Sequence, residues 1–336
     1  MIRRHWKAII LWILGVLAVC ALAVLFLLQK EVPETITYGM SFNTPYVEEL
    51  GLNMEETYTA ILSDLGVRHL RLAAHWTMIE ENRDAYDFAA LDYQIEQAKV
   101  YGADVILGVG RRLPRWPECH VPGWARELSW DEQKEEIRAY ITAVVERYKD
   151  EPHIIYWQVE NEPYLEVFAN EHCGDLDENF LREEIELVRS LDGSRPILVT
   201  DSGNLGTWRG AYSLGDVFGT SVYVYFWNHH LGQFRTILPP AFYRVKENLV
   251  SLFYGEKPTI LIELSAEPWL LEPVVDVPIE TQFTRMDPEK FDSIIEYAKE
   301  TRYARQYLWG VEWWYWLKKN NHPEMWEKGK ELFEKK

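Results

Sequence analysis

Basic residues are scarce in this chain of 336 residues, which has 35 lysines and arginines against 53 aspartates and glutamates and a formal net charge of −18. This balance excludes a nucleic-acid partner, because phosphate binding needs a basic surface. No glycine-rich loop follows the first predicted strand, which argues against a dinucleotide site. No His-x-His follows that strand and no spaced ligand set is present, so we expect no metal and no cofactor.

One long apolar run, Ala8–Leu28, is long enough to cross a bilayer as a helix. Basic residues precede it, so the positive-inside rule places the N-terminus in the cytoplasm and the rest of the chain outside. A cleaved signal peptide is the alternative, but the small-x-small stretch Ala21–Ala23 lies inside the run and favours an uncleaved anchor. We therefore predict a single-pass protein of the cell membrane, with a cytoplasmic tip and anchor over residues 1–30 and an outer domain over residues 31–336.

The rest of the chain alternates between strand-like segments and segments of helical periodicity. The predicted strands cover residues 36–43, 69–74, 104–110, 154–161, 196–201, 217–224, 259–264 and 308–313. The predicted helices cover residues 55–65, 88–101, 130–149, 178–191, 205–214, 240–254, 288–305 and 323–333. Such alternation predicts parallel pairing through crossover helices, and eight strands close into a (β/α)8 TIM barrel. An open doubly wound sheet is the alternative.

Two of the predicted strands end in carboxylates. The strand over 154–161 runs into Glu160, Asn161 and Glu162, and the strand over 259–264 ends in Glu263. Bringing acids to the edge of a core is expensive unless they are paired or used, although solvated acids at a strand end remain the simpler interpretation. A glycosidase needs two such carboxyls, one to protonate the leaving oxygen and one to attack or to activate water.

This pattern resembles the clan of retaining glycoside hydrolases on the (β/α)8 barrel, the 4/7 superfamily, over roughly residues 36–335. Asn161-Glu162-Pro163 is similar to the clan's Asn-Glu pair at the end of strand four, and Ile262-Glu263 to its second Glu at the end of strand seven. Leu70-Arg71-Leu72 is similar to the strand-two arginine region. The pattern departs from the clan after Glu263, where Leu264-Ser265-Ala266 stands in place of the frequent glycine, and the exact family stays unassigned.

The resemblance implies that Glu162 is the general acid/base and Glu263 the nucleophile of a retaining mechanism. Strand alternation puts Glu160 on the same face as Glu162, so spacing alone does not separate the two. Glu267, which lies just past the end of strand seven, is the alternative nucleophile.

Further residues at the same end of the predicted barrel are candidates for substrate binding or support. Arg71 is the expected charge partner of Glu263, with an ion pair to Asp64 or Glu80 as its alternative. Tyr223 is the expected hydroxyl donor, with Tyr225 as its competitor. The remaining candidates are Asn161 for the sugar 2-hydroxyl, Trp313 as a sugar platform, and His75 and His120 for sugar hydroxyls.

Cys119 and Cys173 fall on neighbouring loops at this end of the predicted barrel. A location outside the cytoplasm permits a disulfide, and two unpaired thiols are the alternative.

These observations predict a membrane-anchored, extracytoplasmic hydrolase that cleaves β-glycosidic bonds in poly- or oligosaccharides by a retaining two-carboxylate mechanism. A transglycosylase using the same residues is one alternative. A catalytically silent carbohydrate-binding barrel is another, although the intact pair of carboxylates argues against it.

Overall fold

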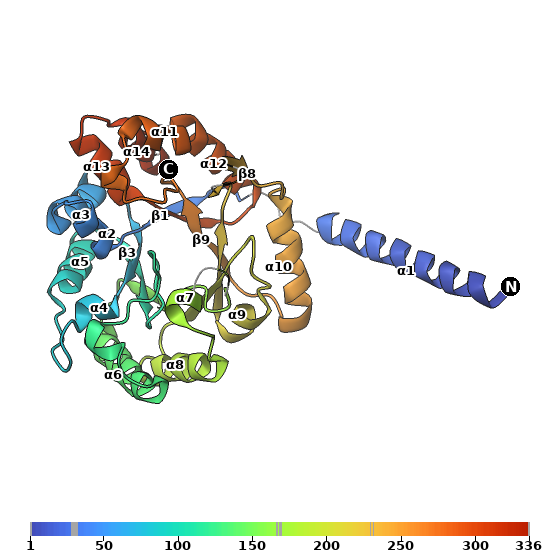
Figure 1. The fold of residues 1–336 in the computed structure, drawn as a ribbon, viewed down its shortest axis with the longest axis horizontal. Coiled ribbons are helices and arrows are strands. Elements are labelled where there is room, and N and C mark those ends of the chain that lie inside the picture. Colours follow the sequence, from blue (N-terminus) through green and yellow to red (C-terminus); the bar gives the residue numbers. More distant parts are fainter. Residues whose placement is uncertain are drawn as a thin grey trace.

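Eight parallel strands close into a barrel at the centre of the molecule, within helices that surround it (Figure 1). The structure, a computed structural model, describes residues 2–27, 33–165, 167, 170–228, 230 and 232–334. The barrel strands are β1 (Thr37–Ser41), β2 (His69–Ala73), β3 (Asp104–Val109), β4 (Ile154–Val159), β5 (Ile197–Asp201), β6 (Val217–Val222), β9 (Thr259–Ser265) and β10 (Arg305–Trp309). They pair in this order, and β10 returns to β1, which confirms the predicted TIM barrel.

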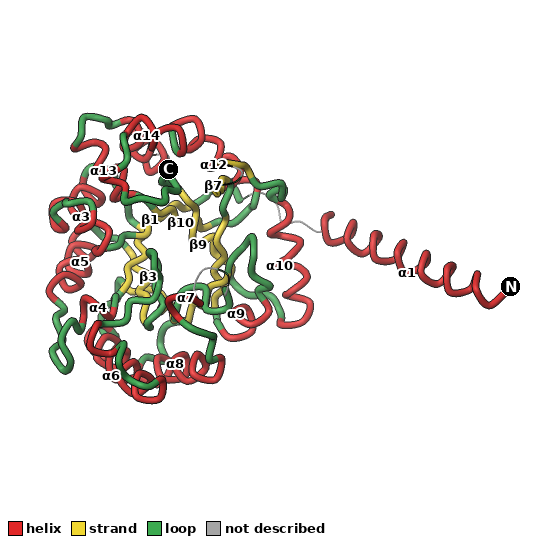
Figure 2. Tube along the Cα trace, in the orientation of Figure 1, coloured by secondary structure: helices red, strands yellow, loops and turns green. Residues whose placement is uncertain are grey.

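Helices follow the strands and form the outer layer, drawn in red around the yellow barrel in Figure 2. They are α2 (Thr44–Glu49), α3 (Met54–Ser63), α4 (Trp76–Ile79), α5 (Ala89–Val100), α6 (Trp130–Tyr148), α7 (Asn170–Cys173), α8 (Glu178–Leu191), α9 (Arg209–Leu214), α10 (Ala241–Tyr254), α11 (Ile279–Arg285), α12 (Pro288–Glu300), α13 (Val311–Lys319) and α14 (Glu324–Glu334). Short 3-10 turns cover Gly123–Ala125 and Val274–Asp276, and β7 (Tyr225–Asn228) and β8 (Gly232–Arg235) form an antiparallel hairpin.

Local sequence signals set where several helices begin. Ser129 and Glu132 form a reciprocal capping box at the start of α6, which satisfies amide groups that a helix leaves free. Asp287 caps α12 and Pro288 occupies its first turn, where a missing N–H is harmless.

The core has two parts. A small cluster joins Ile106 on β3 to residues of β5, β6, β9 and β10, and because β3 pairs with none of these strands, the cluster crosses the barrel interior; its other members are Leu198, Val217, Ile260, Ile262 and Tyr307. A larger cluster packs the outer faces of the strands against the helices. The filled interior leaves the C-terminal rim of the strands as the place for a site.

The eighth strand lies earlier than predicted. It covers Arg305–Trp309 rather than 308–313, and Val311–Lys319 is helix α13. Gly310 separates the two with a φ of 111°, a conformation that glycine adopts without steric penalty. A short apolar run fits a strand and a buried helix equally well by periodicity, which is why the sequence pattern misplaced this boundary.

Residues Ile2–Leu27 form one helix, α1, which extends away from the barrel in Figure 1. Among the described residues, no helix combines the length and the apolar character needed to cross a membrane. The transmembrane helix predicted over Ala8–Leu28 thus finds no support there. Its last residue and the predicted boundary between residues 30 and 31 lie outside the described residues.

Candidate active site

A cavity of about 610 Å³ opens at the C-terminal rim of the barrel. The predicted residues Arg71, Asn161, Glu162, Tyr223 and Glu263 all line it. They come from β2, from the segment after β4, from the residue after β6 and from β9. The barrel therefore brings together side chains that are up to 192 positions apart in the sequence, as between Arg71 and Glu263.

Glu263 accepts one hydrogen bond on each carboxylate oxygen. Arg71 Nη1 donates to Oε1 at 2.8 Å, and the Tyr223 hydroxyl donates to Oε2 at 3.0 Å. Burial and the nearby Glu263 raise the pKa of Tyr223 well above its usual value, so the phenol keeps its proton and donates. A buried carboxylate with donors on both oxygens suits a nucleophile that must be ionised and held in place.

The guanidinium of Arg71 also fixes the neighbouring amides. Its Nε donates to Gln158 Oε1 at 2.8 Å and its Nη2 to Asn161 Oδ1 at 2.7 Å. The fork geometry of arginine allows these contacts together with the ion pair to Glu263, which a lysine cannot reproduce. Asp64 and Glu80, its alternative partners, are engaged elsewhere, with Lys318 and Trp76 respectively.

Glu162 lies on the same cavity with only 3% of its surface exposed. Burial raises its pKa well above the ordinary value, and the charges of Glu263 and then Glu118 raise it further. Its Oε1 has no hydrogen-bond partner among the described residues. A buried carboxyl with a raised pKa and an unpaired oxygen, in the lining of a cavity, suits the role of a general acid.

Glu160 points elsewhere, which the alternation rule did not anticipate. The chain leaves the extended conformation after Val159, and both Glu160 and Glu162 have positive φ, 57° and 44°. The Glu160 carboxylate accepts from the backbone amides of Arg111 and Arg112 at 2.9 and 2.7 Å.

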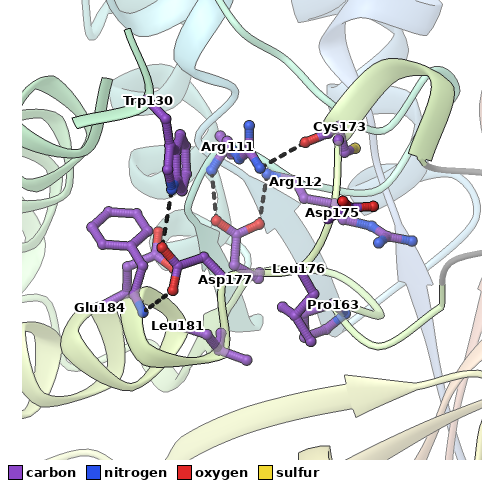
Figure 3. A pocket seen from close by; sticks show the side chains of 13 residues that line it. Arg111, Arg112, Trp130, Pro163, Cys173, Asp175, Leu176, Asp177, Leu181 and Glu184 are labelled. Atoms are coloured by element: carbon purple, nitrogen blue, oxygen red, sulfur yellow. Dashed lines mark hydrogen bonds between the residues drawn. The ribbon is translucent and has the colours of Figure 1, made fainter. Parts of the chain in front are cut away.

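A separate small pocket of about 40 Å³ contains Glu160. Figure 3 shows Arg111, Arg112 and Glu184 around this pocket. Burial and the Glu160 carboxylate raise the pKa of Glu184 well above normal. Glu160 is therefore part of a buried polar network beside the cavity, and Glu162 is the carboxyl that faces it.

Sequence reasoning missed Glu118, another of the acids that line the same cavity. Arg112 pairs with it at 3.1 Å, while burial raises its pKa. It lies in the 20-residue connection between β3 and α6, and a connection of that length in a compact domain is often functional. Loop length was thus the one signal that pointed to it.

Trp313 does not reach the cavity. It is fully buried on α13, and its Nε1 donates to Gln282 Oε1 at 2.6 Å, because the segment that was predicted as a strand is a helix. Trp269 and Trp309 line the cavity instead. Tyr225 also lies apart from Glu263, with its hydroxyl 3.0 Å from Ser293 Oγ.

The two predicted histidines support a loop rather than lining the cavity. His75 Nε2 donates to the carbonyl oxygen of Pro114 at 3.0 Å, and His120 Nε2 to that of Arg115 at 3.1 Å. Burial lowers the pKa of both, that of His120 to about 4, so both rings are neutral at neutral pH. Among the described residues, no group of three or more His, Cys, Asp or Glu side chains is arranged to hold a metal ion.

Glu267, the alternative nucleophile, is paired with Arg115 at 2.7 Å.

Cys119 and Cys173 form a disulfide that joins the loop after β3 to the end of α7. This bond ties together two loops at the rim of the cavity.

Comparisons with known proteins identify the family of the chain. Residues 48–305 match the glycoside hydrolase 42 family model, whose description is Beta-galactosidase. The chain belongs to this family. Beta-galactosidase Bga of Halorubrum lacusprofundi is 26% identical to this chain over 204 residues, which are 55% of this chain and 26% of that protein.

A plant protein is also similar to this chain. Mannan endo-1,4-beta-mannosidase 1 of Solanum lycopersicum is 26% identical over 200 residues, 49% of each chain. The chain spans about a quarter of the length of the first curated β-galactosidases that it matches, with 26% and 27% covered.

Solved structures share the fold. The β-galactosidase from Bacillus circulans sp. alkalophilus superposes with a TM-score of 0.58 at 13% identity, covering 90% of this chain and 56% of that one. Endo-glycoceramidase II from Rhodococcus sp. gives 0.53 at 15% identity, covering 82% and 73%.

Proposed function

We propose that the protein hydrolyses β-glycosidic bonds with retention of configuration, with Glu162 as general acid/base and Glu263 as nucleophile. One observation carries the proposal. A single cavity holds a buried carboxyl with a raised pKa, Glu162, beside a carboxylate that accepts from a guanidinium and a phenol, Glu263. Glycosidases need this division of roles between two carboxyls, one protonated and one ionised.

The reaction follows from these positions in two steps. Glu162 gives its proton to the glycosidic oxygen while a carboxylate oxygen of Glu263 bonds to the anomeric carbon and the aglycone leaves. As Glu263 becomes an ester, Arg71 loses its ionised partner, and the negative charge that raised the pKa of Glu162 is removed. Glu162, now deprotonated, takes a proton from water, which attacks the anomeric carbon and releases Glu263.

The proposed substrate is a β-galactoside, alone or within an oligosaccharide. Support comes from the family description and from the relatives that carry this name. Transglycosylation needs the same residues and differs only in the acceptor that resolves the glycosyl-enzyme. A barrel that only binds carbohydrate does not require a carboxyl with a raised pKa, Glu162, beside a carboxylate that accepts two hydrogen bonds, Glu263.

The test is hydrolysis of a panel of aryl β-glycosides and β-linked galactan, mannan, glucan and xylan by the full chain in detergent. Glu263→Ala and Glu162→Ala are assayed beside the wild type, with Glu183→Ala on the exposed face of α8 as the matched control. We expect activity on galactosides that both active-site variants lose and the control keeps. Binding of a glycan without turnover on any member of the panel would instead establish the silent barrel.

We also propose that the barrel functions outside the cytoplasm and is held at the cell membrane by its N-terminal segment. The Cys119–Cys173 disulfide supports the first part, since such bonds persist mainly in oxidising compartments. Large apolar side chains of α1, among them Trp6, Leu11 and Trp12, are exposed and need apolar surroundings. Protease added to intact cells should remove the barrel, whereas a protected barrel would contradict the proposed orientation.

A further inference from the structure

Helix α10 carries an apolar stripe on the face that it turns away from the barrel. The stripe consists of Val245, Leu249, Leu252 and Phe253, whose helical spacing places them on one side of α10. Leu252 and Phe253 are 72% and 81% exposed. The opposite side of α10 packs on the barrel through its buried residues, which are Tyr243, Arg244, Glu247 and Val250. This helix is therefore apolar on its outer face as well, where a surface helix is normally polar.

The stripe contains no charged side chain. The three charged residues of α10 lie elsewhere on the helix. Arg244 and Glu247 are buried and pair with each other, and Lys246 Nζ donates to two backbone carbonyl oxygens in the loop between β5 and α9. By contrast, α6 and α8 form the surface ion pair Arg138–Glu183. The outer face of α10 thus differs from a surface that is built to face water.

A second apolar helix lies next to α10. Helix α1 contacts α10 and runs away from the barrel on the side that α10 covers (Figure 1). Its side chains Leu11, Trp12 and Leu17 are 69%, 72% and 59% exposed. Although α1 is close by, it leaves Leu252 and Phe253 uncovered. Two neighbouring apolar surfaces are therefore open on one side of the molecule, and such patches mark contacts with a membrane or with another protein.

The lipid surface of a membrane accounts for both helices together. A bilayer offers one continuous apolar layer to α1 and to the stripe, whereas a protein partner that covered only α10 would leave α1 exposed. Helices at a membrane surface bury an apolar face about 5–10 Å into the boundary between headgroups and acyl chains. Ile237, in the segment that leads into α10, is 97% exposed and adds apolar surface to this part of the chain.

We propose that the apolar stripe of α10 lies among the acyl chains at the surface of the membrane that takes up α1. The barrel is then held at the membrane in two places, by α1 and by α10, so it cannot turn freely about the segment that joins them. None of the α10 residues lines the cavity, so the contact does not use the residues of the active site. This inference rests on the proposed attachment through the N-terminal segment, and it does not depend on the hydrolase activity.

Quenching by brominated lipids tests the contact. The full chain carries an environment-sensitive fluorophore on one thiol and is reconstituted into vesicles of phosphatidylethanolamine and phosphatidylglycerol, with or without bromine on the acyl chains. The native Cys20 provides the label on α1. Leu252→Cys in a Cys20→Ala chain provides the label on the stripe. The matched control is Glu96→Cys in the same background, on the exposed side of α5, which lies across the barrel from α10 in Figure 1.

Brominated lipid should quench the labels at positions 20 and 252 and leave the label at position 96 bright. Adding Leu249→Ser and Phe253→Ser to the chain labelled at position 252 makes the stripe polar. In this variant the quenching at position 252 should be lost, while the same two substitutions should leave quenching at Cys20 unchanged. Circular dichroism checks that each labelled chain is folded.

Quenching at Cys20 without quenching at position 252 would overturn the inference and leave the attachment through α1 in place. No quenching at either position would overturn the attachment and the inference together. A label at position 252 that is shielded from water but not quenched, in a chain that has the mass of a dimer in detergent, would assign the stripe to a second copy of the chain and also overturn the inference.

Discussion

Arg71 and Glu263 form a buried ion pair across the rim of the barrel, with Nη1 and Oε1 2.8 Å apart and the two side chains 2% and 9% exposed. They come from β2 and β9, which β10 and β1 separate in the closed sheet. The same guanidinium reaches Asn161 beside the general acid. One side chain thus positions both halves of the reaction centre.

Arg71→Lys should therefore lower kcat strongly. An ammonium group cannot satisfy Glu263, Gln158 and Asn161 at once, and removal of one preorganised donor typically lowers kcat by about 10²- to 10³-fold. Steady-state kinetics on the preferred aryl glycoside measures the loss. The matched control is Arg244→Lys in the buried pair with Glu247 on α10, since neither residue lines the cavity. A kcat within a few fold of wild type for Arg71→Lys would contradict the positioning role.

Glu118→Gln should shift the pH dependence of catalysis. The charge of Glu118 helps to raise the pKa of Glu162, so its removal should lower that pKa. The general acid then loses its proton at lower pH, and the alkaline limb of kcat/KM moves toward acid. A full pH profile of wild type and variant measures this shift, with Glu183→Gln as a charge-matched control. An alkaline limb that stays in place or moves upward would separate Glu118 from the acid.

Glu312 should make stability depend on pH. Burial raises its pKa in the folded protein from 4.5 to about 7. Between these two pH values the unfolded chain releases the proton while the folded chain retains it. The contribution of Glu312 to the free energy of unfolding is therefore fully present below pH 4.5 and is lost as the pH rises to 7.

Glu312→Gln removes the titration. Relative to wild type, the variant should therefore gain up to about 3 kcal/mol between pH 4 and pH 8. Thermal unfolding of both proteins at the two pH values measures the difference. An equal gap between the two proteins at both values would mean that Glu312 titrates normally.

The Cys119–Cys173 bond should stabilise the barrel and its rim. It closes a loop over a sequence separation of 54 residues, for which the chain-entropy model gives about 4 kcal/mol, while typical measurements give about 2–4 kcal/mol. The double variant Cys119→Ala/Cys173→Ala should lose a comparable free energy of unfolding and some activity, since the loop holding Arg115 is loosened. Cys20→Ala, at an exposed free cysteine, is the control. Unchanged stability in the double variant would contradict this account.

Most of the fold and the centre of the candidate site could be predicted from the sequence. Buried parallel strands read as continuous apolar runs, and the carboxylates that interrupt them at Glu162 and Glu263 mark the rim. The predicted end of the eighth strand was wrong because the apolar residues on both sides of Gly310 suit a strand and a helix alike. That error led to the prediction that Trp313 lies at the cavity. Glu160 and Glu162 could not be separated because the turn after Val159 depends on backbone angles that alternation does not describe.

Contacts between loops were beyond prediction for another reason. Arg115 and Glu267 are 152 residues apart, and both lie outside regular elements, where no periodicity fixes the direction of a side chain. Glu118 lies in the same loop as Arg115, and Glu312 lies in the first turn of α13, a segment that the sequence pattern predicted as a strand.

The central claim is that Glu263 forms the glycosyl-enzyme, and trapping that intermediate tests it most directly. A 2-deoxy-2-fluoro β-glycoside with an activated leaving group would be incubated with the full chain, and the labelled peptide mapped by mass spectrometry. The account predicts one added sugar on Glu263, with no label in Glu263→Ala. A label on Glu267, or turnover that never yields a covalent species, would contradict it.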